Sequence, residues 1–177
     1  RRKALRSLYE NNFKCMREVE NPWRIFSLND EEGLLICTWP DTTHRPAVPL
    51  TYNTETMTGF EYQAAVHMMQ EGMYEEGRRI IRAVRDRYDG CKRNPWSELE
   101  CGSNYARSMA SYSILLACSG FEYDGVKARI GFDPLKGVKN GSSFFFSCGT
   151  GWGTANFEKE GWSIRLYNGF LIIREIS

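Results

Sequence analysis

The 177-residue sequence has few of the residues on which metalloenzymes and nucleic-acid-binding proteins depend. It contains only two histidines, His44 and His67, and no His/Cys cluster with metal-ligand spacing, so no catalytic metal site is predicted. The 23 Lys and Arg residues are balanced by 22 Asp and Glu residues, which leaves no excess of basic charge to neutralise a phosphate backbone. We therefore expect no nucleic-acid partner.

Long apolar runs are also missing. The longest fully apolar stretches, such as residues 114–118, fall far short of the roughly 20 residues that cross a bilayer. No apolar segment follows Arg1, so we expect neither a membrane span nor a signal peptide, and a start inside a helical pattern suggests a piece of a longer chain.

The six cysteines are scattered, and none has the two-residue spacing of a zinc knuckle or redox motif. Their even number permits three disulfides, but a chain of this length can bury a core without them. Isolated thiols in a reducing compartment are the simpler interpretation, and we expect a cytoplasmic protein.

Four segments have the apolar spacing of helices. Residues 3–19 form the first, and residues 57–71 and 74–88 predict a helical hairpin closed by Gly72. Within the hairpin, i,i+4 spacing predicts two ion pairs, Glu75 with Arg79 and Arg82 with Asp86. Residues 103–118 are small or apolar nearly all round and carry one charge, Arg107, which indicates a buried helix.

Other segments favour strands. Residues 24–28 and 34–38 flank a turn-rich break and predict a hairpin. The C-terminal third predicts strands at residues 128–132, 143–146 and 162–167, with a tight turn at Asn168-Gly169. The expected organisation is therefore a helical region, residues 1–125, followed by a β-rich element, residues 126–177.

The segment 94–102, which leads into the apolar helix, carries the most informative polar residues. Glu98 and Glu100 are two residues apart and point the same way if the segment is extended. Arg107 should be poorly solvated on its helix, so it needs a carboxylate or the hydroxyls of a ligand as a partner. Either an internal ion pair that braces the helix or a binding site would satisfy it.

A second candidate segment covers residues 56–63. Gly59 allows close approach of a neighbour or ligand, and Glu61 and Gln63 add polar groups near a helix start. The alternative that we favour is helix capping, with Thr56 or Thr58 as the N-cap residue and Glu61, three residues after Thr58, completing a capping box. We expect His67, on the same helix, to be a hydrogen-bonded core histidine rather than a ligand.

Three segments together resemble glycoside hydrolase family 116, which includes β-glucosidases and the non-lysosomal glucosylceramidase. They are residues 38–40, residues 57–63 and, above all, residues 94–112, and the resemblance extends over about residues 5–125. It implies a mainly α fold, part of a barrel of six α-helical hairpins or (α/α)6 toroid, followed by a small C-terminal β element. It also implies retaining hydrolysis of a β-glycoside by two carboxylates, without metal or organic cofactor.

By this resemblance, Glu98 and Arg107 stand at the positions of the Glu and Arg that hold glucose hydroxyls in the family. The nucleophilic Glu and the acid/base Asp lie N-terminal to the matched region, so the chain would need the N-terminal remainder of the same enzyme and would be inactive alone. The substrate would be a small-molecule or oligosaccharide β-glycoside. One departure is Met57, where relatives tend to carry Trp, which puts any stacking role there in doubt.

The alternative from another class is a noncatalytic module, either carbohydrate-binding or a helical interaction scaffold. In the carbohydrate-binding version, aromatic side chains of the C-terminal strands would stack on sugar rings. Aromatics in strands are more often core residues or cross-strand pairs, which is the interpretation we favour for Trp152, Phe157, Trp162 and Tyr167.

Overall fold

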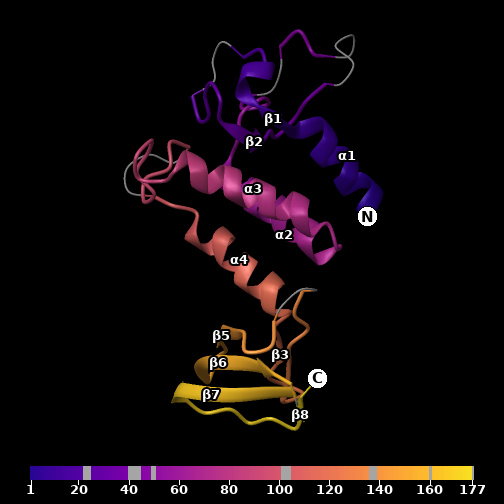
Figure 1. Ribbon diagram of the computed structural model, residues 1–177, viewed down its shortest axis with the longest axis vertical. Helices are drawn as coiled ribbons and strands as arrows, with labels where there is room; N and C mark the ends of the chain where they lie inside the picture. Colours follow the sequence, from indigo (N-terminus) through magenta and orange to yellow (C-terminus); the bar gives the residue numbers. More distant parts are fainter. Residues whose placement is uncertain are drawn as a thin grey trace. The chain divides into compact units, whose positions relative to one another are not determined.

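In the computed structural model, residues 1–21, 25–39, 45–48, 51–100, 105–135, 139–159 and 161–176 are described. Within these ranges the chain forms four α-helices and three small sheets that contain eight strands (Figure 1). It divides into two units, Arg1–Ser113 and Ile114–Ser177, and the division falls within the fourth helix.

The predicted mainly α fold is wrong, because the chain is mixed α/β. Strands occur in both units, and the described residues contain a single helical hairpin rather than a succession of them. The predicted (α/α)6 barrel is therefore not observed. One physical reason is that strand pairing between distant segments, which local periodicity does not report, interrupts the helical pattern near the N-terminus.

The first unit begins with α1 (Arg2–Asn12), which is shorter than the predicted helix over residues 3–19. The next residues form β1 (Phe13–Cys15) and a 3-10 turn (Met16–Glu18), and β1 pairs antiparallel with β2 (Glu32–Leu34). The apolar residues Phe13 and Met16 fit a helical stripe equally well. Cross-strand hydrogen bonds therefore decide the conformation here.

The predicted hairpin between residues 24–28 and 34–38 is also wrong. Residue 24 lies outside the described residues, and the backbone N–H groups of Ile25 and Phe26 donate to the Glu55 carboxylate at 2.9 and 3.3 Å. Residues 35–37 pair instead with residues 53–56, as shown by the 2.7 Å hydrogen bond from Cys37 N–H to the Asn53 carbonyl. The buried Glu55 carboxylate thus accepts from the backbone N–H groups that would otherwise pair with a neighbouring strand.

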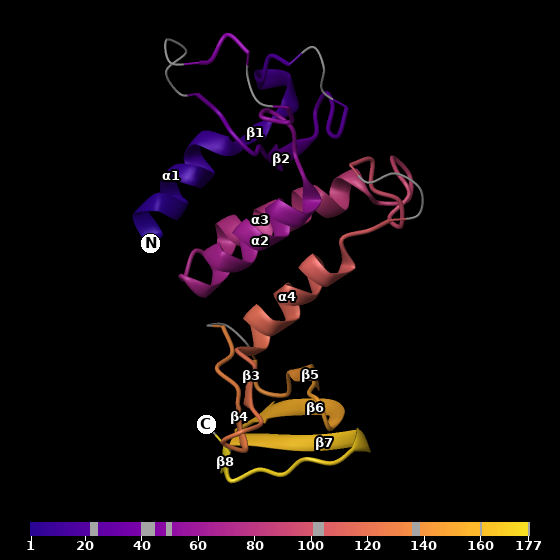
Figure 2. The same cartoon turned by 180° about the vertical axis from the view of Figure 1, so that it is seen from behind.

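The predicted helical hairpin is confirmed by α2 (Thr58–Gln70) and α3 (Tyr74–Arg87), which lie side by side in Figures 1 and 2. Gly72 between them has a φ of 78°, as the predicted left-handed cap requires. The buried faces of these helices meet α1 and β2 in one apolar core, which is made by Leu5, Leu34, Ala65, Met68, Met73 and Ile80.

The surface of α3 carries one of the two predicted ion pairs. Arg82 contacts Asp86 at 2.9 Å, as expected. Glu75 contacts Arg78 instead of Arg79, which reaches across to Glu32 on β2 at 2.7 Å. Tertiary contact therefore overrides the expected pairing within the helix.

The fourth helix, α4 (Ser108–Ser119), begins later than the predicted helix over residues 103–118. Residues 103 and 104 lie outside the described residues, and 105–107 are not helical. The expectation of burial all round is wrong, because Met109 is 85% exposed.

The second unit consists of two three-stranded sheets. One contains β3 (Glu122–Asp124), β4 (Arg129–Gly131) and β8 (Glu175–Ile176), with β4 paired antiparallel to β3 and parallel to β8. The other is the antiparallel sheet of β5 (Ser143–Ser147), β6 (Gly151–Glu158) and β7 (Gly161–Gly169). The three strands predicted here are confirmed, and the unit's core contains Ile130, Phe132, Phe146 and Ala155.

The predicted turn at Asn168-Gly169 is wrong. Both residues belong to β7, where Asn168 pairs with Trp152 and Gly169 pairs with Gly151. Gly169 has a φ of 83°, and a Cβ there would lie 2.1 Å from the Thr150 carbonyl oxygen. Glycine is thus needed at position 169 because the backbone of Thr150 approaches it closely. The hairpin between β6 and β7 closes instead at the Glu158–Gly161 pair.

No helix among the described residues combines the length and the apolar character needed to cross a membrane. Five of the cysteines, Cys15, Cys37, Cys91, Cys118 and Cys148, carry free thiols, and Cys101 lies outside the described residues.

Candidate functional site

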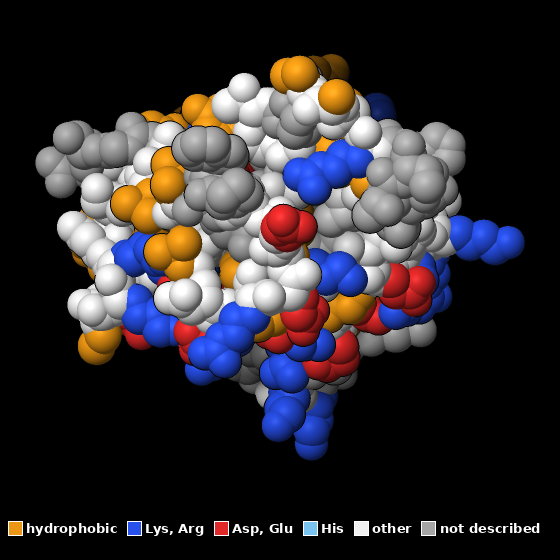
Figure 3. Space-filling model, turned by 90° about the horizontal axis from the view of Figure 1, so that it is seen from above, with side chains coloured by type: hydrophobic (Ala, Val, Ile, Leu, Met, Phe, Trp, Pro, Cys, Tyr) orange, Lys and Arg blue, Asp and Glu red, His pale blue; other side chains and the backbone are white. Residues whose placement is uncertain are grey.

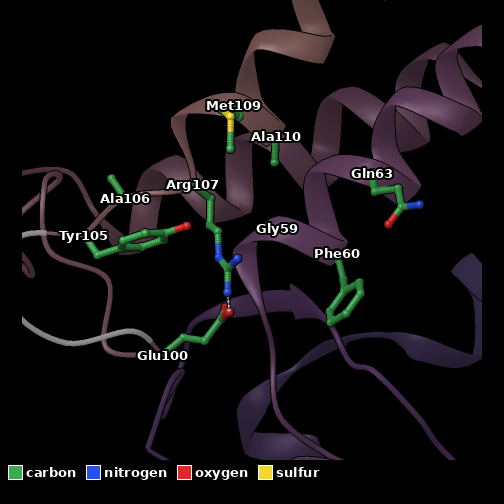
Figure 4. Close-up of a pocket in the computed structure, with 9 residues that line it drawn as sticks. All are labelled: Gly59, Phe60, Gln63, Glu100, Tyr105, Ala106, Arg107, Met109 and Ala110. Carbon is green, nitrogen blue, oxygen red and sulfur yellow. Dashed lines mark hydrogen bonds and ion pairs between the residues drawn. The ribbon is translucent and has the colours of Figure 1, made fainter.

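A cavity of about 400 Å³ lies in the first unit, between the first turn of α2 and the segment that leads into α4. In Figure 4 the Gly59 backbone lies between Phe60 and Arg107, whose side chain extends toward Glu100. The described lining residues come from two stretches of chain, and they are Gly59, Phe60, Gln63, Glu100, Tyr105, Ala106, Arg107, Met109 and Ala110.

An ion pair between Arg107 and Glu100 forms one wall of the cavity (Figure 4). The Glu100 side chain is 5% exposed and that of Arg107 is 34% exposed, so the guanidinium keeps a solvent-facing side. The Tyr105 ring lies 5.3 Å from the Arg107 guanidinium carbon and fixes it further by a cation–π contact. The wall therefore presents strong hydrogen-bonding groups with no net charge.

The Arg107 side chain lies against the backbone of α2 at Gly59. A Cβ at Gly59 would stand 3.4 Å from Cδ and 3.5 Å from Nε of Arg107, which is ordinary van der Waals contact. Arg107, discussed with the other candidate segment, is thus the neighbour at Gly59, but the space there does not require glycine.

Glu98 lies behind this wall and is 6% exposed. One carboxylate oxygen accepts a 2.9 Å hydrogen bond from the Arg107 backbone N–H, and the other accepts from the Thr58 hydroxyl. The predicted capping box is wrong, because Met57 is the N-cap residue of α2 and the Thr58 hydroxyl is given to Glu98. Glu98 thereby joins the start of α2 to the residue that carries the guanidinium.

Glu61, the other half of that predicted capping box, is buried in an ion pair with Arg87, each side chain being 1% exposed. The Glu61 carboxylate also accepts from the Leu34 N–H at 2.9 Å, and Arg87 donates to the Glu32 carbonyl at 2.6 Å. The pair therefore joins α2, α3 and β2. Nothing in the sequence distinguishes Arg87 from the exposed arginines of α3, and its burial was not predicted.

Burial raises the pKa of the Glu61 carboxyl above its ordinary value of 4.5, and the Arg87 guanidinium and the Leu34 N–H oppose this without cancelling it. The folded state therefore binds the proton of Glu61 more tightly than the unfolded state. By linkage, the stability that this proton contributes is complete below pH 4.5 and is lost as the pH rises through the folded-state pKa.

We therefore expect the free energy of unfolding of the wild type to decrease with rising pH, relative to that of Glu61→Gln, from about pH 4.5 upward. Urea denaturation of both proteins at several pH values on each side of this point measures the difference. Carboxyls that do not interact with Glu61 contribute equally to both proteins and cancel, whereas the contribution of Glu98, whose charge raises the pKa of Glu61, does not cancel fully. Parallel profiles, or a slope of the opposite sign, would contradict the raised pKa.

The structure brings the two candidate segments of the sequence together. Gly59 and Gln63 from the first line the cavity with Glu100 and Arg107 from the second. The pairing of Arg107 with a carboxylate is confirmed for Glu100. Five lining residues were missed by sequence reasoning, since small, apolar and aromatic residues at helical spacing are assigned to the core by default; they are Phe60, Tyr105, Ala106, Met109 and Ala110.

The predicted core position of His67 is wrong. His67 is exposed on α2, and His44 lies outside the described residues. The described part of the chain holds no group of three or more His, Cys, Asp or Glu side chains that could bind a metal ion.

The comparisons with known proteins assign no function to the site. No protein-family model matches the sequence, and a search of curated proteins found no match. On the face seen in Figure 3, Lys and Arg side chains are interspersed with Asp and Glu side chains. The function is therefore argued from the cavity.

Proposed function

We propose that this chain supplies the sugar-binding wall of a retaining β-glycosidase of the β-glucosidase or glucosylceramidase kind. The observation that carries the proposal is the Glu100–Arg107 pair on the wall of a cavity whose other described lining residues are uncharged. A neutral site rich in donors and acceptors suits a neutral ligand with many hydroxyl groups. The resemblance of residues 94–112 to family 116 supports the same ligand.

Arg107 is the residue that we expect to contact the sugar directly. Its guanidinium donates several hydrogen bonds in a fixed plane, so it can hold two neighbouring hydroxyl oxygens at once. Glu100 fixes that plane and keeps the charge compensated. The exposed Phe60 ring offers an apolar surface to the C–H face of the sugar.

Glu98 remains a predicted sugar-binding residue by resemblance. In the structure its two carboxylate oxygens already accept from Thr58 and from the Arg107 N–H, which makes it a positioning residue for Arg107. Binding of a sugar hydroxyl would be an additional contact of one of these oxygens, since a carboxylate oxygen accepts more than one hydrogen bond.

The hydrolysis itself requires a nucleophilic carboxylate and an acid/base carboxyl. Glu100, the described carboxylate that lines the cavity, is bound to Arg107 and is not free for proton transfer. We therefore assign the two catalytic carboxyls to residues outside this chain. A cytoplasmic enzyme that uses neither metal nor organic cofactor is part of the same proposal.

The 177-residue chain alone should accordingly show no turnover of an aryl β-glucoside. The measurement is release of the aryl alcohol by the purified chain, followed over hours at high protein concentration. An intact β-glucosidase assayed in parallel controls for the assay. Turnover that persists through purification would place the catalytic pair within the chain and overturn the assignment.

One observation favours the alternative of a carbohydrate-binding module. Phe145, Trp152 and Tyr167 form a row across the β5–β6–β7 sheet, with ring centroids 6.1 and 5.5 Å apart and with all three side chains exposed. Titration of cellobiose against intrinsic Trp fluorescence separates the two functions. The alternative predicts that Trp152→Ala abolishes binding, whereas the proposed function predicts that Arg107→Ala does so.

A further inference from the structure

A second hollow, of about 450 Å³, continues from the cavity along the exposed side of α2. It shares three lining residues with the cavity, Gly59, Gln63 and Ala110. Its remaining described lining residues come from α2 and α4, and they are Val66, His67, Gln70 and Ser113. The two hollows together are referred to below as the α2 groove.

The floor of the α2 groove is one face of a helix. Phe60, Gln63, His67 and Gln70 follow one another at spacings of three and four residues, so they project from the same side of α2, and all four are exposed. At ~1.5 Å per residue this row extends about 15 Å along the helix axis. A single sugar at Arg107 would leave most of it unused.

The chemistry of the extension differs from that of an ion-binding or apolar site. The Gln63 and Gln70 amides each donate and accept hydrogen bonds, as do the His67 imidazole and the Ser113 hydroxyl. Val66 is buried beneath them, and no charged side chain is among the described residues that line this second hollow. An anion or cation would find no opposite charge here, whereas hydroxyl groups find partners for both their proton and their lone pairs.

We propose that the α2 groove binds a neutral β-linked oligosaccharide, with its terminal sugar at Arg107 and the following sugars over Gln63, His67 and Gln70. This rests on the proposed function, which provides the sugar at Arg107, and it selects oligosaccharides over β-glycosides with a small or apolar aglycone. Gln63 stands where the two hollows meet and contacts the sugars on both sides of the first linkage. Gln70 contacts only the far end of the ligand.

The test compares binding of glucose, cellotriose and laminaritriose to the 177-residue chain by isothermal titration calorimetry. We expect at least one trisaccharide to bind about tenfold more tightly than glucose, the gain from one or two additional hydrogen bonds. Gln70→Ala should remove most of this gain and leave glucose binding unchanged, whereas Arg107→Ala should weaken both ligands. Arg82→Ala, on the exposed surface of α3, is the matched control and should change neither.

The outcomes separate this inference from the proposed function. If glucose binds and depends on Arg107, but neither trisaccharide binds more tightly, the extended groove is overturned and the proposed function stands. If a trisaccharide gains affinity that Gln70→Ala does not reduce, the placement along α2 is overturned. If neither glucose nor either trisaccharide binds to the wild type, both proposals fail. Thermal melting of each variant identifies one that has not folded, and Gln70→Glu then replaces Gln70→Ala as a variant of nearly the same size.

Discussion

Replacement of Arg87 by methionine should destabilise the chain by about 3–5 kcal/mol, the range observed when one partner of a buried ion pair is removed. Arg87 and Glu61 are each 1% exposed, so the substitution leaves the Glu61 carboxylate buried without its counter-charge. It also leaves the Glu32 carbonyl without the donor that reaches it at 2.6 Å. A loss of this size is a large part of the stability of an ordinary domain, which is about 5–15 kcal/mol.

Urea denaturation followed by circular dichroism measures this change. The matched control is Arg82→Met, which removes an arginine from the same helix whose pair with Asp86 is exposed (78% and 55%) and which should therefore change the stability by under about 1 kcal/mol. If Arg87→Met does not fold, the double variant Glu61→Leu, Arg87→Met removes both charges and should recover much of the loss. Equal effects of Arg87→Met and Arg82→Met would show that the Glu61–Arg87 pair is not buried as described.

Replacement of Arg107 by alanine should lower kcat/KM about 100-fold in the complete enzyme. Two hydrogen bonds from a charged group to sugar hydroxyls are worth about 1.5 kcal/mol each at the low end of their range, and their sum corresponds to this factor. The measurement is steady-state hydrolysis of a β-glucoside, together with the melting temperature of each variant.

Two results decide between a binding role and a bracing role for Arg107. Loss of kcat/KM with little change in melting temperature supports contact with the sugar. Unchanged kinetics with a lowered melting temperature would mean that the Glu100–Arg107 pair only braces the segment before α4. Arg82→Ala serves as the control, because it also removes an arginine, and Arg82 is exposed on α3 and does not line the cavity.

The parts of the fold that were predicted correctly depend on local order. The α2–α3 hairpin follows from two amphipathic patterns and a glycine that adopts a positive φ. The β1–β2 pairing was not predictable in this way, because its two strands are separated by 16 residues of other structure and Phe13 fits both a helical stripe and a strand. At Asn168-Gly169, a local turn signal yields to a close approach between two strands.

The candidate site was predictable only in outline. A single arginine in an apolar stretch has to find a carboxylate, and this reasoning correctly paired Arg107 with a neighbouring glutamate. It could not choose between Glu98 and Glu100, because turns interrupt the segment that contains them and their side chains take separate partners. Thr58 and Glu61 match a capping box locally, but distant residues outcompete the helix end for both side chains.

The contrast between the buried Glu98, behind the cavity wall, and the exposed Met109, which lines the cavity, also bears on how this site can evolve. Glu98 connects Thr58 to the Arg107 backbone, so almost any replacement there disrupts several contacts at once. Met109 is 85% exposed and lines the same cavity, and substitutions at such surface positions usually change stability by under about 0.5 kcal/mol. Substitutions at the exposed lining residues can therefore change ligand preference without moving the Arg107 guanidinium. Met109 and Phe60 are the natural positions for a library of variants with altered specificity.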